Sequence, residues 1–257
     1  KLHLPYIQII VNTNAADALI SLGRYPEAEQ GCRAALAIAQ HMNARHTTAQ
    51  ILNTLGIIFS HLGRYGDALE VYDQAQHITG ELGSVFEEAN VLFNRAQVLT
   101  MLGRYDEAVR VSERVREQAQ ELQSQRLLAE ALLALAGASF GQGDLARAYA
   151  AADSAQQLAN EIGSKHDAGI ALRLLGMIAA QRNQIFADAF EESILMLSTI
   201  QHRFELARTW AEYGFALAKI GNLERSATYL KQAYDAFILI GAHAEVERVA
   251  PRLERST

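Results

Sequence analysis

The sequence predicts an all-α fold, a superhelix of repeated antiparallel helix pairs. The tetrapeptide Leu-Gly-Arg-Tyr begins at Leu22, Leu62 and Leu102, so three copies recur at a spacing of 40 residues. Each tyrosine is followed at the same distance by an alanine, and the 257 residues include only three prolines. A fixed period of this length is typical of a repeat array, in which each unit buries its apolar face by stacking on its neighbours.

Glycine and asparagine mark the ends of the expected helices, because both tolerate the left-handed backbone that ends a helix. One series is Gly23, Gly63, Gly103, Gly143, Asn183 and Gly221. A second series, about half a repeat later, is Asn43, Gly83, Gln123, Gly163 and Gly241. The segments between these marks show helical apolar spacing and no strand-like alternation. We therefore predict two helices per repeat and about thirteen helices in all.

Small residues recur where the two helices of a repeat are expected to cross. In the first helices they are Ala16, Gly56, Ala96, Ala136, Gly176 and Gly214, and twelve residues later come Ala28, Ala68, Ala108, Ala148 and Ser226. We interpret these pairs as close crossings, since larger side chains would separate the helix axes. Asp188 breaks the series in the fifth repeat, where the spacing of the turn residues falls to 38. A shortened second helix and a local change of twist are expected there.

These marks divide the chain into six helix pairs in a single superhelical domain spanning residues 1–257. The expected repeats are 5–43, 44–83, 84–123, 124–163, 164–200 and 201–241. Residues 243–254 contain several charges and Pro251, so they are expected to form a polar capping helix. The first residues show neither an initiator methionine nor a signal-peptide pattern. A fragment of a larger protein and a trimmed or disordered start both fit this beginning.

Composition disfavours several classes of partner. The net charge is −6 and no basic run occurs, so nucleic acid is not expected. No apolar run approaches the roughly 18–20 residues that span a bilayer, so a membrane partner is not expected. Cys32 is the single cysteine, which allows no intramolecular disulfide and fits a reducing, cytoplasmic location. Its position four residues after Ala28 predicts a buried, inert thiol.

The order of small residue, aromatic residue or leucine, Gly-x-Tyr and alanine resembles the tetratricopeptide repeat over nearly the whole chain. Two features depart from that pattern. The period is 40 rather than about 34 residues, and Gly80, Gln120 and Asn160 stand where the closing proline would be, which predicts longer second helices. This long form resembles the C-terminal arrays of bacterial signal-transduction ATPases and transcriptional activators. It is also similar to arrays in kinesin light chains and spindle-orientation adaptors.

The resemblance implies that the first helices line a concave groove in which ligands bind. At the positions that correspond to the family's contact positions, we select as ligand- or peptide-binding residues Asn53, Asn94, Gln97, Arg173, Arg208 and Glu212. Asparagine amides both donate to and accept from a peptide backbone, which suits an extended peptide. The clustered Lys/Asn set of the family's two-carboxylate clamp is not evident.

The sequence contains no catalytic constellation. It lacks His-Glu-x-x-His, a phosphate-cradling glycine loop with lysine, and Gly-x-Ser-x-Gly, so no enzyme activity and no cofactor are expected. The histidines near turns, at positions 46, 166, 202 and 243, are interpreted as surface or capping residues and not as a metal site. The acidic residues 188, 191 and 192 are interpreted as a solvated face.

Two further features have more than one interpretation. Tyr25, Tyr65 and Tyr105 stand at turns, where packing between repeats is favoured over a stacking platform for a ligand. Arg95 occupies a position where other repeats carry leucine. It is expected either to reach the groove or to pair with a carboxylate such as Glu130, and the ion pair is favoured.

We therefore expect a non-enzymatic protein–protein interaction scaffold in signalling, which binds a peptide or protein segment in its concave groove. The alternative is an effector-sensing or autoinhibitory module of a larger signalling ATPase or transcription regulator. A nucleotide-binding domain in the parent gene would favour the alternative. The sequence predicts no particular oligomeric state.

Overall fold

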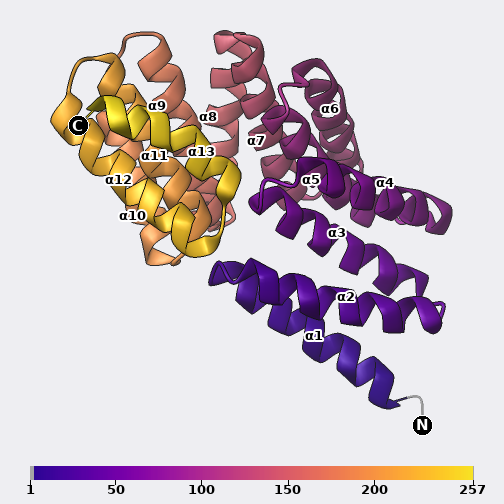
Figure 1. Ribbon diagram of the computed structural model, residues 1–257. Coiled ribbons are helices and arrows are strands. Elements are labelled where there is room, and N and C mark those ends of the chain that lie inside the picture. The colour runs from indigo at the N-terminus through magenta and orange to yellow at the C-terminus, as the bar shows by residue number, and fades with distance from the viewer. Residues whose placement is uncertain (1–2, 257) are drawn as a thin grey trace.

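The computed structural model describes residues 3–256, and all of the regular elements in that range are helices joined by short turns, which confirms the predicted fold class (Figure 1). The thirteen helices are α1 His3–Ser21, α2 Tyr25–His41, α3 Arg45–His61, α4 Tyr65–Leu82, α5 Val85–Met101, α6 Tyr105–Glu121, α7 Gln125–Gln142, α8 Leu145–Glu161, α9 Lys165–Gln181, α10 Ala187–Thr199, α11 Arg203–Lys219, α12 Leu223–Ile240 and α13 His243–Ser256. Within the described residues, no helix is long and apolar enough to cross a membrane.

Both predicted series of turn residues adopt the left-handed backbone. Every member has a positive φ, including the non-glycine residues Asn43 at 52° and Gln123 at 50°. The N–H of the next residue then bonds a carbonyl five positions back, as Ala44 does to Ala39 at 2.9 Å. These bonds satisfy carbonyl groups that a helix end would otherwise leave without donors. Gln201, with φ of 55°, does the same after α10 and was not predicted.

The helices form two layers around a common axis. Consecutive helices pack in antiparallel pairs, and from α3 onward each odd-numbered helix also contacts the next odd-numbered helix, as α5 contacts α7 and α7 contacts α9. The odd-numbered helices therefore form the inner layer, which lines the concave surface, and the even-numbered helices cover them on the outside (Figure 1). This arrangement places one face of each odd-numbered helix where a ligand can reach it.

The predicted crossings are close, but the partner of the mid-helix glycine differs from the expected one. A methyl group added at Gly56 would overlap the ring of Tyr72, which lies one turn beyond Ala68 on α4. Ala68 itself is fully buried. In the sixth repeat, Ser226 donates a 2.9 Å hydrogen bond to the carbonyl of Gly214. The glycine in the middle of the first helix thus makes room for a large side chain of the second helix, as Gly56 does for Tyr72. The small residue of the second helix lies against the backbone near that glycine, as Ser226 does at Gly214.

The tyrosines at the turns pack between repeats, as predicted. Tyr25 is 1% exposed, and its ring lies 5.1 Å from that of His61 in the next repeat. A methyl group added at Gly141 on α7 would overlap the ring of Tyr105. Cys32 is buried as predicted, and burial raises the pKa of its thiol to about 11, so it stays protonated at neutral pH.

Arg95 forms an ion pair, as favoured, but its partner is Asp73 and not Glu130. Its Nε lies 3.2 Å from Asp73 Oδ1. Asp73 belongs to α4, the helix that precedes α5 and packs against it, so the carboxylate approaches from the outer layer. Glu130 instead accepts from Arg126 on its own helix, at 2.6 Å.

The fifth repeat has the shortened second helix that its spacing predicted. The helix α10 has 13 residues, whereas α9 before it has 17. An aromatic cluster packs beside it, with the Phe190 ring stacked on Tyr213 at 5.0 Å and the Phe186 ring edge-on to Phe190 at 6.1 Å. Apolar packing therefore remains around α10 although the helix is short.

The superhelix closes on itself, so the last repeat touches the first two. The ring of Phe204 on α11 stacks on His61 at the end of α3, with 4.1 Å between centroids. A methyl group added at Gly23 would overlap Ile240, and one at Gly63 would overlap Ala244. The end of α12 and the start of α13 thus rest on the turns of the first two repeats, as Figure 1 shows for the yellow ribbon beside the turn between α1 and α2.

The final helix also contributes to this closure. Its Val249 is fully buried and Glu245 is 3% exposed, so α13 presents one face to the interior and the other to solvent. Pro251 lies inside the helix near its end. The helix at the predicted cap position is therefore both a cover for the last repeat and part of the closed ring.

Candidate functional site

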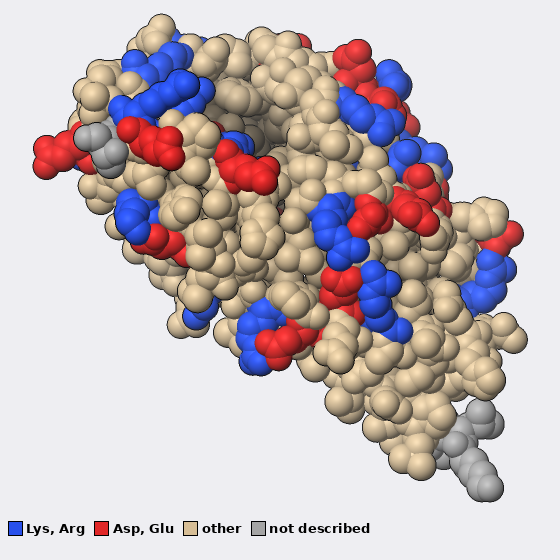
Figure 2. Space-filling view, viewed as in Figure 1, with Lys and Arg blue, Asp and Glu red and all other residues tan. Residues whose placement is uncertain are grey.

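The inner layer encloses two adjoining hollows, and Figure 2 shows the molecule hollowed between the C-terminal helices and the middle repeats. The larger, which we call the amide groove, has a volume of about 580 Å³ and lies between α1, α3, α5 and α7. Its central residues are Gln50, Asn53, Ile57, Asn90, Phe93 and Asn94. The smaller, the inner cavity, has about 110 Å³ and lies where α3, α5, α7, α9 and α11 converge.

Two asparagines form the floor of the amide groove. Asn94 on α5 donates through Nδ2 to Asn53 Oδ1 on α3, at 3.0 Å. Both side chains are half-buried. Among the described residues, Asn53 Nδ2 and Asn94 Oδ1 have no hydrogen-bond partner. The pair therefore leaves one amide nitrogen and one amide oxygen free, and these can donate to and accept from an extended peptide backbone.

Two more polar contacts join the helices that line the amide groove. Gln50 Nε2 on α3 donates to Glu87 Oε1 on α5 at 3.1 Å. Arg126 Nη2 on α7 donates to Asn90 Oδ1 at 3.0 Å. The groove is thus lined by a ladder of polar groups that crosses three successive repeats. Such a ladder matches a ligand that lies across the inner helices.

Apolar side chains lie among these amides. Phe86, also in the lining, is 44% exposed, and Ile10 on α1 is 43% exposed. The guanidinium of Arg126 lies 5.6 Å from the centre of the Phe86 ring. Exposed apolar area in a concave site is where a ligand gains binding free energy, because it removes that area from water.

Carboxylates outnumber cations in the lining of the amide groove. Asp17, Glu87 and Glu130 line it, and Arg126 is the lining's cation among the described residues. Burial raises the pKa of Glu130 to about 7, although the neighbouring charge of Arg126 acts in the opposite direction. Glu130 is 9% exposed, so the neutral acid and the carboxylate have similar populations near neutral pH.

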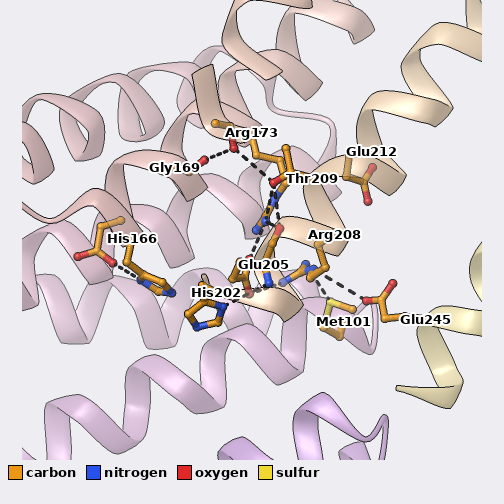
Figure 3. A network of polar contacts seen from close by, with 12 residues as sticks. Met101, His166, Gly169, Arg173, His202, Glu205, Arg208, Thr209, Glu212 and Glu245 are labelled. Carbon is orange, nitrogen blue, oxygen red and sulfur yellow. Dashed lines mark hydrogen bonds and ion pairs between the residues drawn. The ribbon is translucent and has the colours of Figure 1, made fainter. Parts of the chain in front are cut away.

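The inner cavity is bordered by alternating Arg and Glu side chains (Figure 3). Arg173 Nη1 lies 2.6 Å from Glu205 Oε2, and Arg208 Nη1 lies 3.5 Å from Glu205 Oε1. Burial by itself would raise the pKa of Glu205. The two guanidinium groups outweigh it and hold that pKa well below its usual range. Glu205 is therefore ionised and paired at all physiological pH values.

The same network continues to the last helix. Arg208 Nε lies 3.9 Å from Glu245 Oε1 on α13, and Arg248 Nε lies 2.7 Å from Glu245 Oε2. Arg248 Nη1 also contacts Glu212 Oε1 at 2.6 Å. In addition, Arg208 donates to Met101 Sδ on α5, at 3.6 Å. Three arginines and three glutamates thus balance one another, and they help hold the closed ring.

Two of the histidines near turns meet beside this network. The rings of His166 and His202 lie 4.7 Å apart, and His166 Nδ1 lies 3.0 Å from Asp167 Oδ1. His202 Nδ1 accepts from the N–H of Glu205 and so caps α11, which confirms the capping interpretation for that residue. Within the described residues, no three His, Cys, Asp or Glu side chains are grouped to hold a metal ion.

The structure divides the six predicted binding residues between two places. Asn53 and Asn94 meet in the amide groove, and Gln97 lines the inner cavity. Arg173, at 3% exposed, and Arg208 lie in the ion network, while Glu212 pairs with Arg248. The sequence prediction did not include Glu87 and Arg126. The available signal was helical spacing: Glu87 stands three residues before Asn90, and Arg126 stands four residues before Glu130, so each pair shares one face of its helix.

Comparisons with known proteins agree with this geometry. Residues 8–78 match the family model of the tetratricopeptide repeat. No curated protein sequence matches the chain. Together with the helix pairs described above, the match defines a tetratricopeptide-repeat-like superhelix.

Three solved structures show how far the fold extends. A Rap protein complexed with Competence and Sporulation Factor has a TM-score of 0.73 at 14% identity, over 97% of this chain and 74% of that one. NprR in complex with its cognate peptide NprX has a TM-score of 0.72 at 16% identity, over 96% and 71%. A signal-transduction ATPase with a tetratricopeptide repeat sensor from Pyrococcus horikoshii has 0.63 at 13%, over 96% and 38%. At these identities the likeness is one of fold.

Proposed function

We propose that this chain is a non-enzymatic interaction module that binds an extended peptide or protein segment in the amide groove. The observation that carries the proposal is the Asn53–Asn94 pair, which leaves one amide nitrogen and one amide oxygen free on the groove floor. Exposed apolar side chains beside the pair supply area that a ligand covers. The proposal needs no cofactor and no metal.

Two of the similar structures support the proposal through what they contain. The Rap protein is in complex with Competence and Sporulation Factor, and NprR is in complex with its cognate peptide. Both share the superhelical path of this chain. A peptide ligand therefore fits the fold as well as the groove.

A peptide library on beads tests the proposal, with affinities of selected peptides measured by isothermal titration calorimetry. Replacing Asn94→Ala removes the free Oδ1 and the hydrogen bond that holds Asn53, and is expected to weaken binding by about tenfold, the loss of one to two net hydrogen bonds. Asn160→Ala is the matched control, because Asn160 is an exposed amide on the outer helix α8. Equal affinities for Asn94→Ala and the unmodified chain would place the ligand elsewhere.

The other predicted residues contribute to this proposal only if the ligand extends beyond the amide groove. Gln97 contacts a ligand that extends from the amide groove into the inner cavity. Arg173 and Arg208 also line the inner cavity and contact the same ligand there, whereas Glu212 contacts it only if its ion pair with Arg248 rearranges. Comparing Asn94→Ala with Gln97→Ala on a short and a long peptide separates these regions. For a ligand confined to the amide groove, only Asn94→Ala is expected to weaken the affinity.

The second candidate is an effector-sensing or autoinhibitory module of a larger signalling ATPase or transcription regulator. The similarity to the ATPase with a repeat sensor favours it, and this chain spans 38% of that protein's length. The parent gene decides between the candidates, because a nucleotide-binding domain beside the array supports the sensor. A parent without such a domain removes it.

A further inference from the structure

We infer that the peptide held in the amide groove carries a lysine or arginine side chain, which pairs with Glu87 and Glu130. This inference rests on the function proposed above and adds the chemical class of the ligand. Three observations support it: the charge balance of the two hollows, the carboxylate oxygens that lack hydrogen-bond partners, and the side chains around those oxygens.

The two hollows differ in charge balance. In the inner cavity and its continuation to α13, each of Glu205, Glu245 and Glu212 has at least one arginine partner. The amide groove contains three acidic side chains, of which Glu130 is about half ionised near neutral pH, and one guanidinium, which already contacts Glu130. The groove therefore has an excess of negative charge that a cationic ligand group would neutralise.

Two carboxylate oxygens at the groove have no hydrogen-bond partner in the part of the chain that the structure describes. Glu87 Oε1 lies 2.6 Å from His46 Nε2, and Glu130 Oε1 accepts a hydrogen bond from Arg126 Nη1 at 2.6 Å. Among the described residues, their Oε2 atoms have no hydrogen-bond partner, and both are buried, so a ligand donor reaches them by displacing the side chains that cover them. A buried acceptor without a donor is costly, so a donor supplied by a ligand stabilises the complex relative to the free chain.

These two glutamates flank the same asparagine. Glu87 lies one turn before Asn90 on α5, and Glu130 lies on α7, whose Arg126 bonds Asn90. Arg126 already bonds both Asn90 and Glu130, so a cationic side chain that enters at Asn90 would lie between Glu87 and the Arg126–Glu130 pair. Phe86 and Phe93 lie in the same lining, where they can cover the aliphatic stem of such a side chain and face its charge.

The raised pKa of Glu130 is consistent with a site that binds a cation. Burial raises its pKa to about 7, with Arg126 on its own helix and His166 on α9 acting to lower it and Asp167 on α9 acting to raise it. The ionisable group of α5 in this lining is Glu87. A bound ammonium or guanidinium group stabilises the carboxylate form, so cation binding and proton release from Glu130 are linked.

The test uses the whole chain and a library of random hexapeptides on beads. Bound peptides are expected to be enriched in lysine or arginine at one position. Acetylating that lysine in the best peptide is expected to weaken binding by about 10- to 100-fold, the range of a charge-assisted hydrogen bond. Acetylating the peptide's amino terminus instead is expected to change little. The reverse pattern would assign the site to an amino terminus and overturn the inference.

Glu130→Gln keeps the shape of the side chain and removes its charge. It is expected to weaken binding of the lysine peptide by about tenfold or more and to leave the acetylated peptide unchanged. Glu70→Gln is the control, because Glu70 is exposed on the outer helix α4.

Affinity for the lysine peptide should also rise about tenfold from pH 6 to pH 8, as Glu130 ionises. A rise of that size that persists in Glu130→Gln would come from His166 and would contradict the assignment.

The outcomes separate this inference from the function on which it rests. Peptides that depend on Asn94 but are neutral or acidic, or that bind Glu130→Gln unchanged, would overturn the cationic site and keep the peptide-binding function. Retention of no peptide at all, or of peptides indifferent to Asn94→Ala, would overturn both.

Discussion

His61 stacks on Phe204, with their ring centroids 4.1 Å apart, and so joins the second repeat to the sixth. Tyr25 of the first repeat lies edge-on to both rings, at 5.1 Å and 6.5 Å. His61 is partly buried, and desolvation by burial lowers the pKa of its imidazole to about 3. The contact that closes the ring therefore depends on a histidine that stays neutral.

Acid is expected to open this contact. The pKa of His61 is lower in the folded chain than its ordinary value near 6.5, so its contribution to stability is present above pH 6.5 and is lost as the pH falls towards 3. The free energy of unfolding should fall by up to about 1.4 kcal/mol per pH unit in that window from this group. Urea unfolding at pH 7, 6, 5 and 4 measures the slope. His61→Phe should flatten it, and an identical slope in that variant would contradict the assignment.

Glu130 is expected to act in the opposite direction. Its pKa is raised to about 7 by burial, so its contribution to stability is present below its unfolded value near 4.5 and is lost as the pH rises through 7. The unmodified chain should therefore lose about 3 kcal/mol relative to Glu130→Gln between pH 4.5 and pH 8. Denaturant unfolding of both proteins across this range provides the comparison. A constant difference between them would show that Glu130 ionises normally.

Removing Arg173 is expected to be strongly destabilising, because it leaves Glu205 buried with only the more distant Arg208. Arg173→Met should lower the free energy of unfolding by about 3–5 kcal/mol. Replacing Glu205→Leu in the same chain should recover much of the loss. The control is Arg24→Met, since Arg24 pairs with Glu27 at the surface and its loss should be hard to detect. Similar effects of the two arginine variants would contradict a buried network.

Enlarging Gly56 is expected to disrupt the second repeat, because the ring of Tyr72 occupies the space of any added side chain. Gly56→Leu should lower the free energy of unfolding by about 1–3 kcal/mol or more through overpacking. Gly66→Leu is the matched control, since no atom lies near an added methyl group there. Thermal unfolding compares the two variants, and a melting temperature of Gly56→Leu within error of the unmodified chain would exclude the close crossing.

The fifth repeat is expected to contain the least stable internal segment, residues 183–200. Its second helix is the short α10, and Ile185 before it is 87% exposed. In a solenoid, a weak unit weakens both of its interfaces, so amide exchange should be fastest here away from the termini. Hydrogen-exchange mass spectrometry tests this. Protection of 185–197 equal to that of 69–78 on α4 would mean that the aromatic cluster around Phe190 compensates for the missing turn.

The period of the sequence predicted most of the local structure. The left-handed residues, the burial of Cys32, the packing of the turn tyrosines and the short α10 all follow from one repeat and its nearest neighbours. The wrong partner for Arg95 has a local cause as well, because the ion pair was sought on the inner layer while Asp73 lies on the outer one.

The closed ring and the buried ion network could not be predicted in the same way. A small rotation between successive repeats accumulates over six units, and it decides whether Phe204 meets His61 or passes it. That rotation depends on side-chain packing at every interface, which no single motif encodes. The free amide functions of Asn53 and Asn94 likewise depend on which atoms the neighbouring helix satisfies.

Closure of the ring also determines the order in which the chain can fold. An open array of helix pairs needs only contacts between neighbours in sequence, which form early because their loops are short. The stacking of Phe204 on His61 joins distant parts of the chain, so its loop-closure entropy is repaid only after the intervening repeats have stacked. Docking of the last helices onto the first turns is therefore a late event. Until it occurs, the nascent chain exposes the aromatic rings of Tyr25 and His61 to other molecules.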